Sequence, residues 1–328
     1  AVEFFRQRSV RLPVRLAPTG NKRKAAVPNS TSETVRRSFS HQPMQKGLIV
    51  KMKKHVFAKG GIDIPMSKGD RELVWADCFN AEKLDTGFWN PLPHMGGSDI
   101  ERKMDASTHE MRDGSIFLTS YKKTDGSGYV SPYFLMTTDR MEFKYGYFEI
   151  TAKIPFYKGN SAAFWFCSNG RTKRGNLAEI DMVELLGREN NVVSNLHSWG
   201  KTHTSFDGKI KRDDRSHTFD SEPEKLREEY HTYFMDWTDK YIDFGVDGEV
   251  YCHADLTAEG KKNFRSEKVC MNTFHQPVHV ILSEFLYTPG RKLGWGLDGT
   301  EAPFRYTLEL KHVALYQKRG ETMKIFNK

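Results

Sequence analysis

The chain has 328 residues, of which 38% are hydrophobic and 12% aromatic, enough for one large all-β domain or two smaller domains. No apolar run is long enough for a membrane-spanning helix, and the four cysteines have no metal-ligand spacing. The formal net charge of +8 is unevenly distributed along the chain.

The basic excess lies at the N-terminus. Residues 1–71 contain 16 Lys or Arg and 4 Asp or Glu, a balance of +12, which leaves residues 72–328 at −4. Scattered Pro, Ser and Thr with little periodicity predict a basic, flexible segment there. Binding of nucleic acid or of an acidic polysaccharide is the alternative. Few aromatic side chains are available to stack on bases, chiefly Phe4, Phe5 and Phe39, so we expect no nucleic-acid partner.

Strand-like segments begin at Glu72. An alternating stretch follows the tight-turn pair Asp113-Gly114, and two further hairpins are predicted, one of which turns at Asp247-Gly248. The predicted strand regions are Leu73–Asn80, Leu84–Asn90, Met111–Ser120, Ser131–Pro155, Ala162–Phe166, Asn195–Trp199, Tyr230–Thr238, Tyr241–Tyr251, Phe274–Glu284 and Tyr306–Gln317. Many short strands with almost no helical period predict an all-β fold, a two-sheet antiparallel β-sandwich.

The stretch Asn176–Gly187 sets three carboxylates among apolar residues, the pattern of a buried strand. Strand alternation points Glu179 and Asp181 to one face and Glu184 to the other. A single β-bulge at Met182-Val183 would bring all three acids onto one face.

Three carboxylates on one face suit a retaining glycosidase, which holds a nucleophile and an acid/base carboxyl about 5–5.5 Å apart. The long side chains of Glu179 and Glu184 can approach each other from four strand steps apart. The shorter Asp181 fits between them and can keep their pKa values different. The alternative is an ordinary strand with an acidic outer face.

The segment Glu179-Ile-Asp-Met-Val-Glu184 resembles the catalytic signature of glycoside hydrolase family 16 in its β-bulge form, found in laminarinases, agarases, porphyranases and carrageenases. The resemblance covers residues 72–318 and includes Phe143–Pro155 and Ala162–Phe166. It implies a jelly roll with a concave substrate cleft, a polysaccharide or oligosaccharide substrate, and no cofactor.

By this resemblance, Glu179 is the nucleophile, Glu184 the acid/base and Asp181 their modulator. The expected substrate-binding residues are Trp165, His197, Trp199, Glu284, Trp89 and Trp295. Each has a structural alternative. A Trp in a strand is often a core residue, a lone His is often only hydrogen-bonded, and Glu284 could pair with a loop Arg such as Arg291.

Two departures from the family pattern narrow these expectations. Lys311 stands where many members have an Asp that helps to bind a structural calcium ion, so we expect no metal site. The segments that flank the acids differ from those of laminarinases, which weakens the case for a β-1,3-glucan and favours a β-galactan, so both a β-1,3(4)-glucan and a β-galactan are open as substrates. A non-catalytic polysaccharide receptor and a transglycosylase also remain open, although plant transglycosylases mostly have one residue fewer between the acids.

The expected organisation is a basic segment over residues 1–71, a catalytic domain over residues 72–318 and a C-terminal tail over residues 319–328. The cysteines are expected to be buried free thiols, with a disulfide left open. No signal-peptide pattern is present, but the absent initiator Met suggests a processed chain. We therefore expect a secreted or extracytoplasmic monomer that binds no membrane.

Overall fold

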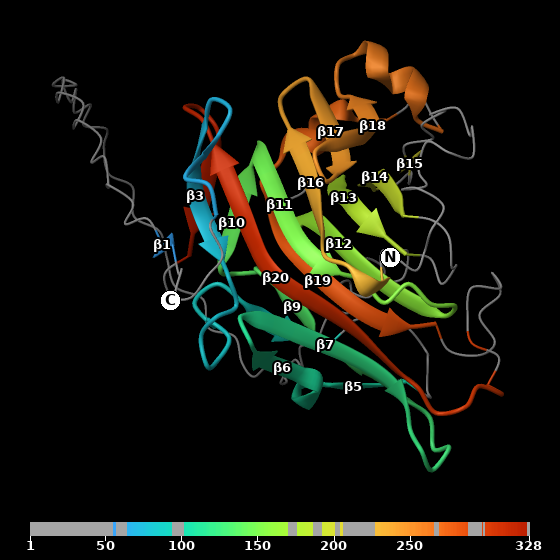
Figure 1. The fold of residues 1–328 in the computed structure, drawn as a ribbon. Coiled ribbons are helices and arrows are strands. Elements are labelled where there is room, and N and C mark those ends of the chain that lie inside the picture. The colour runs from blue at the N-terminus through green and yellow to red at the C-terminus, as the bar shows by residue number, and fades with distance from the viewer. Residues whose placement is uncertain are drawn as a thin grey trace, which may run out of the picture.

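The computed structural model describes residues 55–56, 64–93, 102–169, 176–185, 192–200, 204–205, 227–265, 269–287, 297 and 299–326 (Figure 1). Among these residues, 12 strands form one sheet and 9 form a second. Nearly all neighbouring strands are antiparallel; the parallel pairs are β1–β3 and β5–β8. The predicted all-β, two-sheet sandwich is confirmed.

The larger sheet contains β1 (His55–Val56), β2 (Ser67–Lys68), β3 (Arg71–Asp77), β5 (Arg102–Asp105), β6 (His109–Arg112), β7 (Ser115–Lys122), β8 (Tyr129–Pro132), β11 (Gly146–Lys153), β16 (His231–Trp237), β17 (Tyr241–Val246), β18 (Glu249–Asp255) and β20 (Arg305–Gln317). The smaller sheet contains β4 (Asn90–Leu92), β9 (Phe134–Met136), β10 (Met141–Lys144), β12 (Asn160–Ser168), β13 (Leu177–Glu184), β14 (Val193–Trp199), β15 (Thr204–Ser205), β19 (Val278–Leu286) and β21 (Thr322–Ile325). Three short 3₁₀ helices are described, η2 (Ala106–Thr108), η3 (Glu259–Asn263) and η4 (Met271–His275).

Strand β12 shows how the smaller sheet divides its two faces. Phe164 and Phe166 point into the core between the sheets, together with Leu282 of the neighbouring β19. Trp165 points to the opposite face, where it packs with Ile281 of β19. The whole of β12 is buried, but its two sets of side chains belong to different layers. The outer layer is the one that the acids of β13 share.

Two hairpin turns follow the sequence prediction. Asp113 and Gly114 connect β6 to β7 with φ values of 52° and 68°. Asp247 and Gly248 connect β17 to β18 with φ values of 50° and 88°. Positive φ at both central residues is the requirement of a type I′ turn, which an Asp-Gly pair meets at low cost.

The sandwich extends beyond both boundaries that the sequence predicted. Arg71 is buried and its guanidinium lies 2.8 Å from the carboxylate of Asp236 and 3.3 Å from that of Glu321. Lys68 forms an ion pair with Glu149. Strand β21 pairs with β10, so the expected C-terminal tail contributes an edge strand. The domain therefore includes residues on both sides of the expected range of 72–318. Residues 1–54 and 57–63, which hold most of the basic segment, lie outside the described residues.

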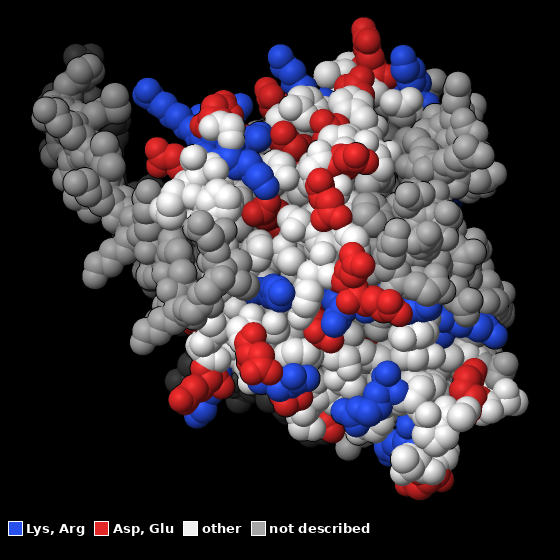
Figure 2. Space-filling model, in the orientation of Figure 1, with Lys and Arg blue, Asp and Glu red and all other residues white. Residues whose placement is uncertain are grey.

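All four cysteines are buried free thiols, which settles the disulfide question for this structure. No helix of the described part of the chain is long and apolar enough to cross a membrane. On the face of the molecule seen in Figure 2, Lys and Arg lie among Asp and Glu, and the described residues form no continuous basic surface there.

Candidate active site

The predicted β-bulge is present in β13. Asp181 pairs with Asn195 of β14 and Glu184 with Val193, so that two residues, Met182 and Val183, lie opposite one residue of β14. The register with β12 shifts at the same place. Met182 and Val183 both point into the core and are fully buried. A bulge that places two successive side chains in the core returns the next side chain to the outer face.

The three acids therefore lie on one surface of the smaller sheet. Glu179, Asp181 and Glu184 pair with Cys167, Trp165 and Ala163 of β12, which all belong to the outer layer. Glu179 and Asp181 are 2% and 4% exposed, and Glu184 is half-buried. The two ends of the triad differ in solvent access, with Glu184 the more open.

Burial raises the pKa of all three carboxyls. The charge of Asp181 adds to this effect on both neighbours, and burial together with this charge raises the pKa of Glu184 to about 7. Burial raises the pKa of Asp181 to about 7. Since like charges in a low dielectric oppose ionisation, the cluster keeps at least one proton near neutral pH.

Two side chains of β14 contact the acids directly. The Trp199 indole N–H donates to Glu179 Oε2 over 2.9 Å. His197 Nε2 lies 3.3 Å from Asp181 Oδ2 and 3.9 Å from Glu179 Oε1. The His197 ring stacks on the Trp199 ring with centroids 5.4 Å apart. Both residues were predicted from the sequence as sugar-binding residues, and the structure brings both to the acids.

Trp165 also lies where the sequence predicted. It is directly across from Asp181 on β12, on the same face, and is 8% exposed. Its indole N–H donates to Ser283 Oγ of β19 over 3.3 Å. The indole ring is therefore held at its nitrogen edge beside the acids.

Glu284 requires a correction. It lies on β19 next to Ser283, but its side chain points into the core and is fully buried. Asn160 Nδ2 donates to Glu284 Oε1 over 2.5 Å, and burial raises the pKa of Glu284 to about 8. The two-residue period of β19 places Ser283, not Glu284, on the face of the acids.

Trp89 also requires a correction, because it is a core residue. It is 0% exposed and packs against Trp75 and Phe79, with ring centroids 5.8 and 5.9 Å apart. Its indole N–H donates to Asp77 Oδ2 over 2.8 Å. A ring enclosed in this way cannot stack on a sugar. Trp295 lies outside the described residues.

Sequence reasoning missed three residues of the same face. Asn195 pairs with Asp181, His279 with Cys167, and Ser283 with Ala163. The register across β14, β13, β12 and β19 identifies them. Asn195 is two residues from His197 and Ser283 is next to Glu284, whereas His279 is five residues from Glu284. Strand alternation was the available signal. In β19 it was weak, because apolar side chains occupy both faces of that strand.

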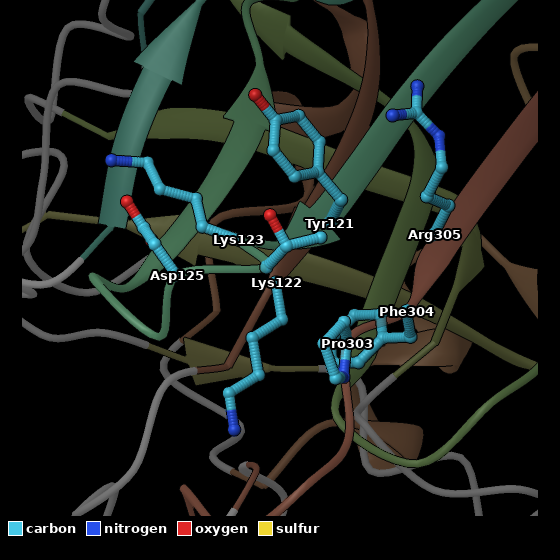
Figure 3. A pocket seen from close by; sticks show the side chains of 8 residues that line it. Tyr121, Lys122, Lys123, Asp125, Pro303, Phe304 and Arg305 are labelled. Carbon is cyan, nitrogen blue, oxygen red and sulfur yellow. The ribbon is translucent and has the colours of Figure 1, made fainter.

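The structure also has a hollow of about 610 Å³, and Figure 3 shows the side chains that line it. Its lining comes from the end of β7, the β7–β8 connection, the segment before β20 and the first residue of β20, namely Tyr121, Lys122, Lys123, Thr124, Asp125, Pro303, Phe304 and Arg305. It contains none of the three acids or their aromatic neighbours. This hollow is therefore separate from the candidate active site.

Glu179, Asp181 and His197 are the described side chains whose potential metal-ligand atoms all lie within 4.8 Å of one another. They are the same groups that form the acid cluster. The sequence predicted Lys311 in place of the family's calcium-binding Asp, and the Lys311 ammonium lies over the Tyr230 ring at 3.9 Å. A cation in this place opposes a calcium ion, so these residues do not fit that metal.

Comparisons with known proteins agree with this geometry. The profile of the family described as glycosyl hydrolases family 16 matches residues 97–280, more than half of the chain. A β-glucanase of Rhodothermus marinus is 26% identical over 225 residues, which cover 65% of this chain and 74% of that protein. A protein of Arabidopsis thaliana named "Probable xyloglucan endotransglucosylase/hydrolase protein 27" is 31% identical over 170 residues, which cover 49% of this chain and 44% of that protein.

A solved structure has a similar fold. The laminarinase from Flavobacterium sp. UMI-01 superposes with a TM-score of 0.56 at 25% identity, and the match covers 75% of this chain and all of that one.

Proposed function

The chain belongs to glycosyl hydrolase family 16, and from this we propose that it is a retaining endo-β-glycanase that cleaves internal linkages of a β-1,3(4)-glucan. The observation that carries the proposal is the bulge in β13, which turns Glu184 out of the core and onto the face of Glu179. Two Glu carboxyls on one face, with one held protonated near neutral pH, are the groups that a double-displacement mechanism uses.

In the first step, the Glu179 carboxylate attacks the anomeric carbon and the glycosidic C–O bond breaks. The proton of Glu184 goes to the leaving oxygen, and a glycosyl-enzyme ester remains on Glu179. In the second step, Glu184 takes a proton from water, the resulting hydroxide displaces Glu179, and both carboxyls return to their starting states.

Two contacts of Glu179 work against the effect of burial. Burial and the charge of Asp181 raise the pKa of Glu179 to about 8, whereas the Trp199 indole N–H, which donates to Glu179, and the nearby His197 favour its ionised form. Glu184 has a pKa raised to about 7 and is the more open to solvent, which suits a group that exchanges protons with water. When Asp181 holds a proton, its charge no longer opposes the ionisation of Glu179.

The glucan substrate rests on the relatives. The proteins matched by sequence include a β-glucanase and a glucan endo-1,3-β-glucosidase, and a similar solved structure is a laminarinase. The segments flanking the acids depart from the laminarinase pattern, so a β-galactan is the second candidate substrate. Transglycosylation is a second candidate reaction, favoured by the similarity to the Arabidopsis protein. The bulged spacing of the acids argues against it.

The test combines substrate screening with substitutions. The protein should release reducing ends from laminarin or lichenan faster than from agarose, porphyran, carrageenan or mucin glycans, and NMR should show the β-anomer as the first product. Glu179→Gln and Glu184→Gln should each remain folded and lose nearly all hydrolysis. An α-anomer as first product would contradict retention. Tight polysaccharide binding without any released reducing ends would instead support a non-catalytic receptor, and lengthened oligosaccharides would indicate a transglycosylase.

A further inference from the structure

The backbone of the bulge is held by hydroxyl groups from two other strands. Met182 has no register partner on β12 or on β14. Its carbonyl oxygen instead lies within hydrogen-bond distance of two hydroxyls, Ser194 Oγ at 2.7 Å and the Tyr251 hydroxyl at 3.1 Å. The two hydroxyls also lie 2.7 Å from each other.

These two contacts come from different sheets. Ser194 is the single residue of β14 that faces Met182 and Val183, since its neighbours pair with Asp181 and Glu184. It is buried. Tyr251 belongs to β18 in the other sheet and packs against the core. The Met182 carbonyl, which has no partner in the strand ladder, therefore links the bulge of the smaller sheet to Tyr251 of the larger sheet.

The number of hydroxyl protons indicates how the three groups bond. Ser194 and Tyr251 each have one proton, and the Met182 carbonyl has none to donate. One hydroxyl must donate to the other, so only one of them donates to the carbonyl at a time. The two 2.7 Å distances favour a chain in which Tyr251 donates to Ser194 and Ser194 donates to Met182. If Ser194 loses its hydroxyl, Tyr251 is already 3.1 Å from the carbonyl and can take its place.

We propose that Ser194 and Tyr251 are positioning residues for the acid/base Glu184, acting through the bulge carbonyl of Met182. The inference rests on the proposed function and adds to it the groups that hold the acid in place. Without the bulge, the two-residue period of β13 would turn Glu184 toward the core, so the direction of Glu184 depends on the bulge. A buried carbonyl without a hydrogen bond would raise the free energy of the bulged form. The two hydroxyls remove this cost because they provide a donor for the Met182 carbonyl.

The redundancy of the two hydroxyls gives the test. Ser194→Ala and Tyr251→Phe should each lower kcat/KM on the polysaccharide only about two- to threefold, because the remaining hydroxyl still reaches Met182. The double variant should lose about thirtyfold or more, well beyond the product of the single losses, because a displaced catalytic group is costly. Ser194→Thr retains a hydroxyl and should keep wild-type activity.

A second substrate separates a displaced acid from general damage. The dinitrophenyl β-glycoside of a laminari-oligosaccharide has a leaving group that needs little protonation, so its kcat/KM reports attack by Glu179 with little demand on Glu184. The double variant should keep most of its kcat/KM on this substrate while losing the polysaccharide reaction. The limb of its polysaccharide pH profile that reports the acid should also shift, because Glu184 no longer has the same surroundings.

Two control variants remove similar hydroxyls away from the bulge. Ser198→Ala removes a buried hydroxyl of the same strand that contacts Asn176 and Thr273, and Tyr233→Phe removes a buried phenol of the larger sheet. Both should lower the melting temperature at most, without separating the two substrates.

Equal losses on both substrates in the double variant, or simply multiplicative losses from the single variants, would overturn the positioning role. If Glu179→Gln and Glu184→Gln kept full activity, the proposed function itself would fail, which is a different outcome from the failure of this inference.

Discussion

Two buried glutamates in this sandwich have the same solvent access and opposite electrostatics. Glu179 on β13 is 2% exposed and its pKa is raised, by burial first and then by the charge of Asp181. Glu149 on β11 is 3% exposed and its pKa is lowered. Burial alone would raise the pKa of Glu149, but His312 and Lys68 stabilise its charge more strongly. The Tyr316 hydroxyl also donates to Glu149 over 3.2 Å.

Because Glu179 and Glu149 are buried to nearly the same extent, the groups around each one, rather than burial, account for the difference between an active-site carboxyl and a structural carboxylate. Glu149 has a cation and donors that offset its desolvation, and it joins strands of the larger sheet to the segment before β3. Glu179 has like charges beside it, and the protein retains that unfavourable arrangement. A fold tolerates such a cluster at a functional site and offsets its cost elsewhere.

Replacing Glu179 by glutamine should affect activity, whereas replacing Glu149 should affect stability, and this is the largest effect we expect. Glu179→Gln should lower turnover of the polysaccharide at least about a thousandfold with an unchanged or raised melting temperature, because it removes a repulsive charge. Glu149→Gln should keep turnover and lower stability by about 1–2 kcal/mol, a modest loss because Lys68 is 38% exposed and can be solvated. Initial rates and thermal melts of both variants measure this. A Glu149→Gln variant that lost turnover without losing stability would contradict the division.

The pH dependence of stability should distinguish Glu149 from a third buried glutamate, Glu284. The pKa of Glu284 is raised from 4.5 to about 8, so its contribution to stability is present below about pH 4.5 and is lost as the pH rises toward 8. The loss amounts to up to about 5 kcal/mol. The pKa of Glu149 is lowered, so its contribution is present at neutral pH and is lost as the pH falls below its ordinary range.

Denaturant melts of the wild type, Glu284→Gln and Glu149→Gln from pH 3 to 9 would measure these slopes. Glu284→Gln should flatten the alkaline decline without abolishing it, because the three acids of β13 contribute to the same decline. Glu149→Gln should converge with the wild type at low pH. Parallel curves for all three proteins would mean that these glutamates do not have the surroundings described above.

The sequence predicted the catalytic strand better than it predicted the surrounding residues, for physical reasons. Apolar residues on both sides of the acids left a bulge as the way to keep Glu184 out of the core, and the structure contains that bulge. The family resemblance and the sandwich are also confirmed. Glu284 was wrong, because β19 is buried on both faces and has no alternation to show which side chains face the cleft. Trp89 was wrong because it precedes β4 and packs in the core, where no strand period applies.

Other contacts could not be read from the sequence at all. Ser194 and Tyr251 meet at Met182 from separate sheets, and only the packed sandwich brings them together. The ion pairs of Lys68 and Arg71 likewise join residues that are far apart in the chain. The composition of residues 1–71 predicted a flexible segment. Nothing in that composition indicates that the last residues of the segment pack on β3.

Shortening the chain tests this boundary together with the partners of Glu149. A chain that begins at Ile64 keeps Lys68 and Arg71, whereas one that begins at Glu72 loses both. The shorter chain should be less stable by about 2–3 kcal/mol, because Glu149, Asp236 and Glu321 lose cationic partners. It should still hydrolyse a soluble oligosaccharide below its melting temperature, because none of these groups contacts β13. Equal melting temperatures for the two chains would restore the boundary at Glu72.

The smallest effect should separate two tryptophans that the sequence treated alike. Trp165 lies beside Asp181 on the outer face, and Trp89 is enclosed by Trp75 and Phe79. Trp165→Phe keeps a ring in place but loses the indole area and the 3.3 Å hydrogen bond to Ser283, so it should raise KM about two- to fivefold and hardly change the melting temperature. Trp89→Phe loses the 2.8 Å bond to Asp77 and leaves a small cavity, so it should lower stability by about 1–3 kcal/mol at unchanged KM. Steady-state kinetics and melts of the two variants suffice, since each serves as the control for the other. A raised KM in Trp89→Phe alone would mean that the ring of Trp89 reaches the substrate after all, and that the core and cleft faces have been assigned the wrong way round.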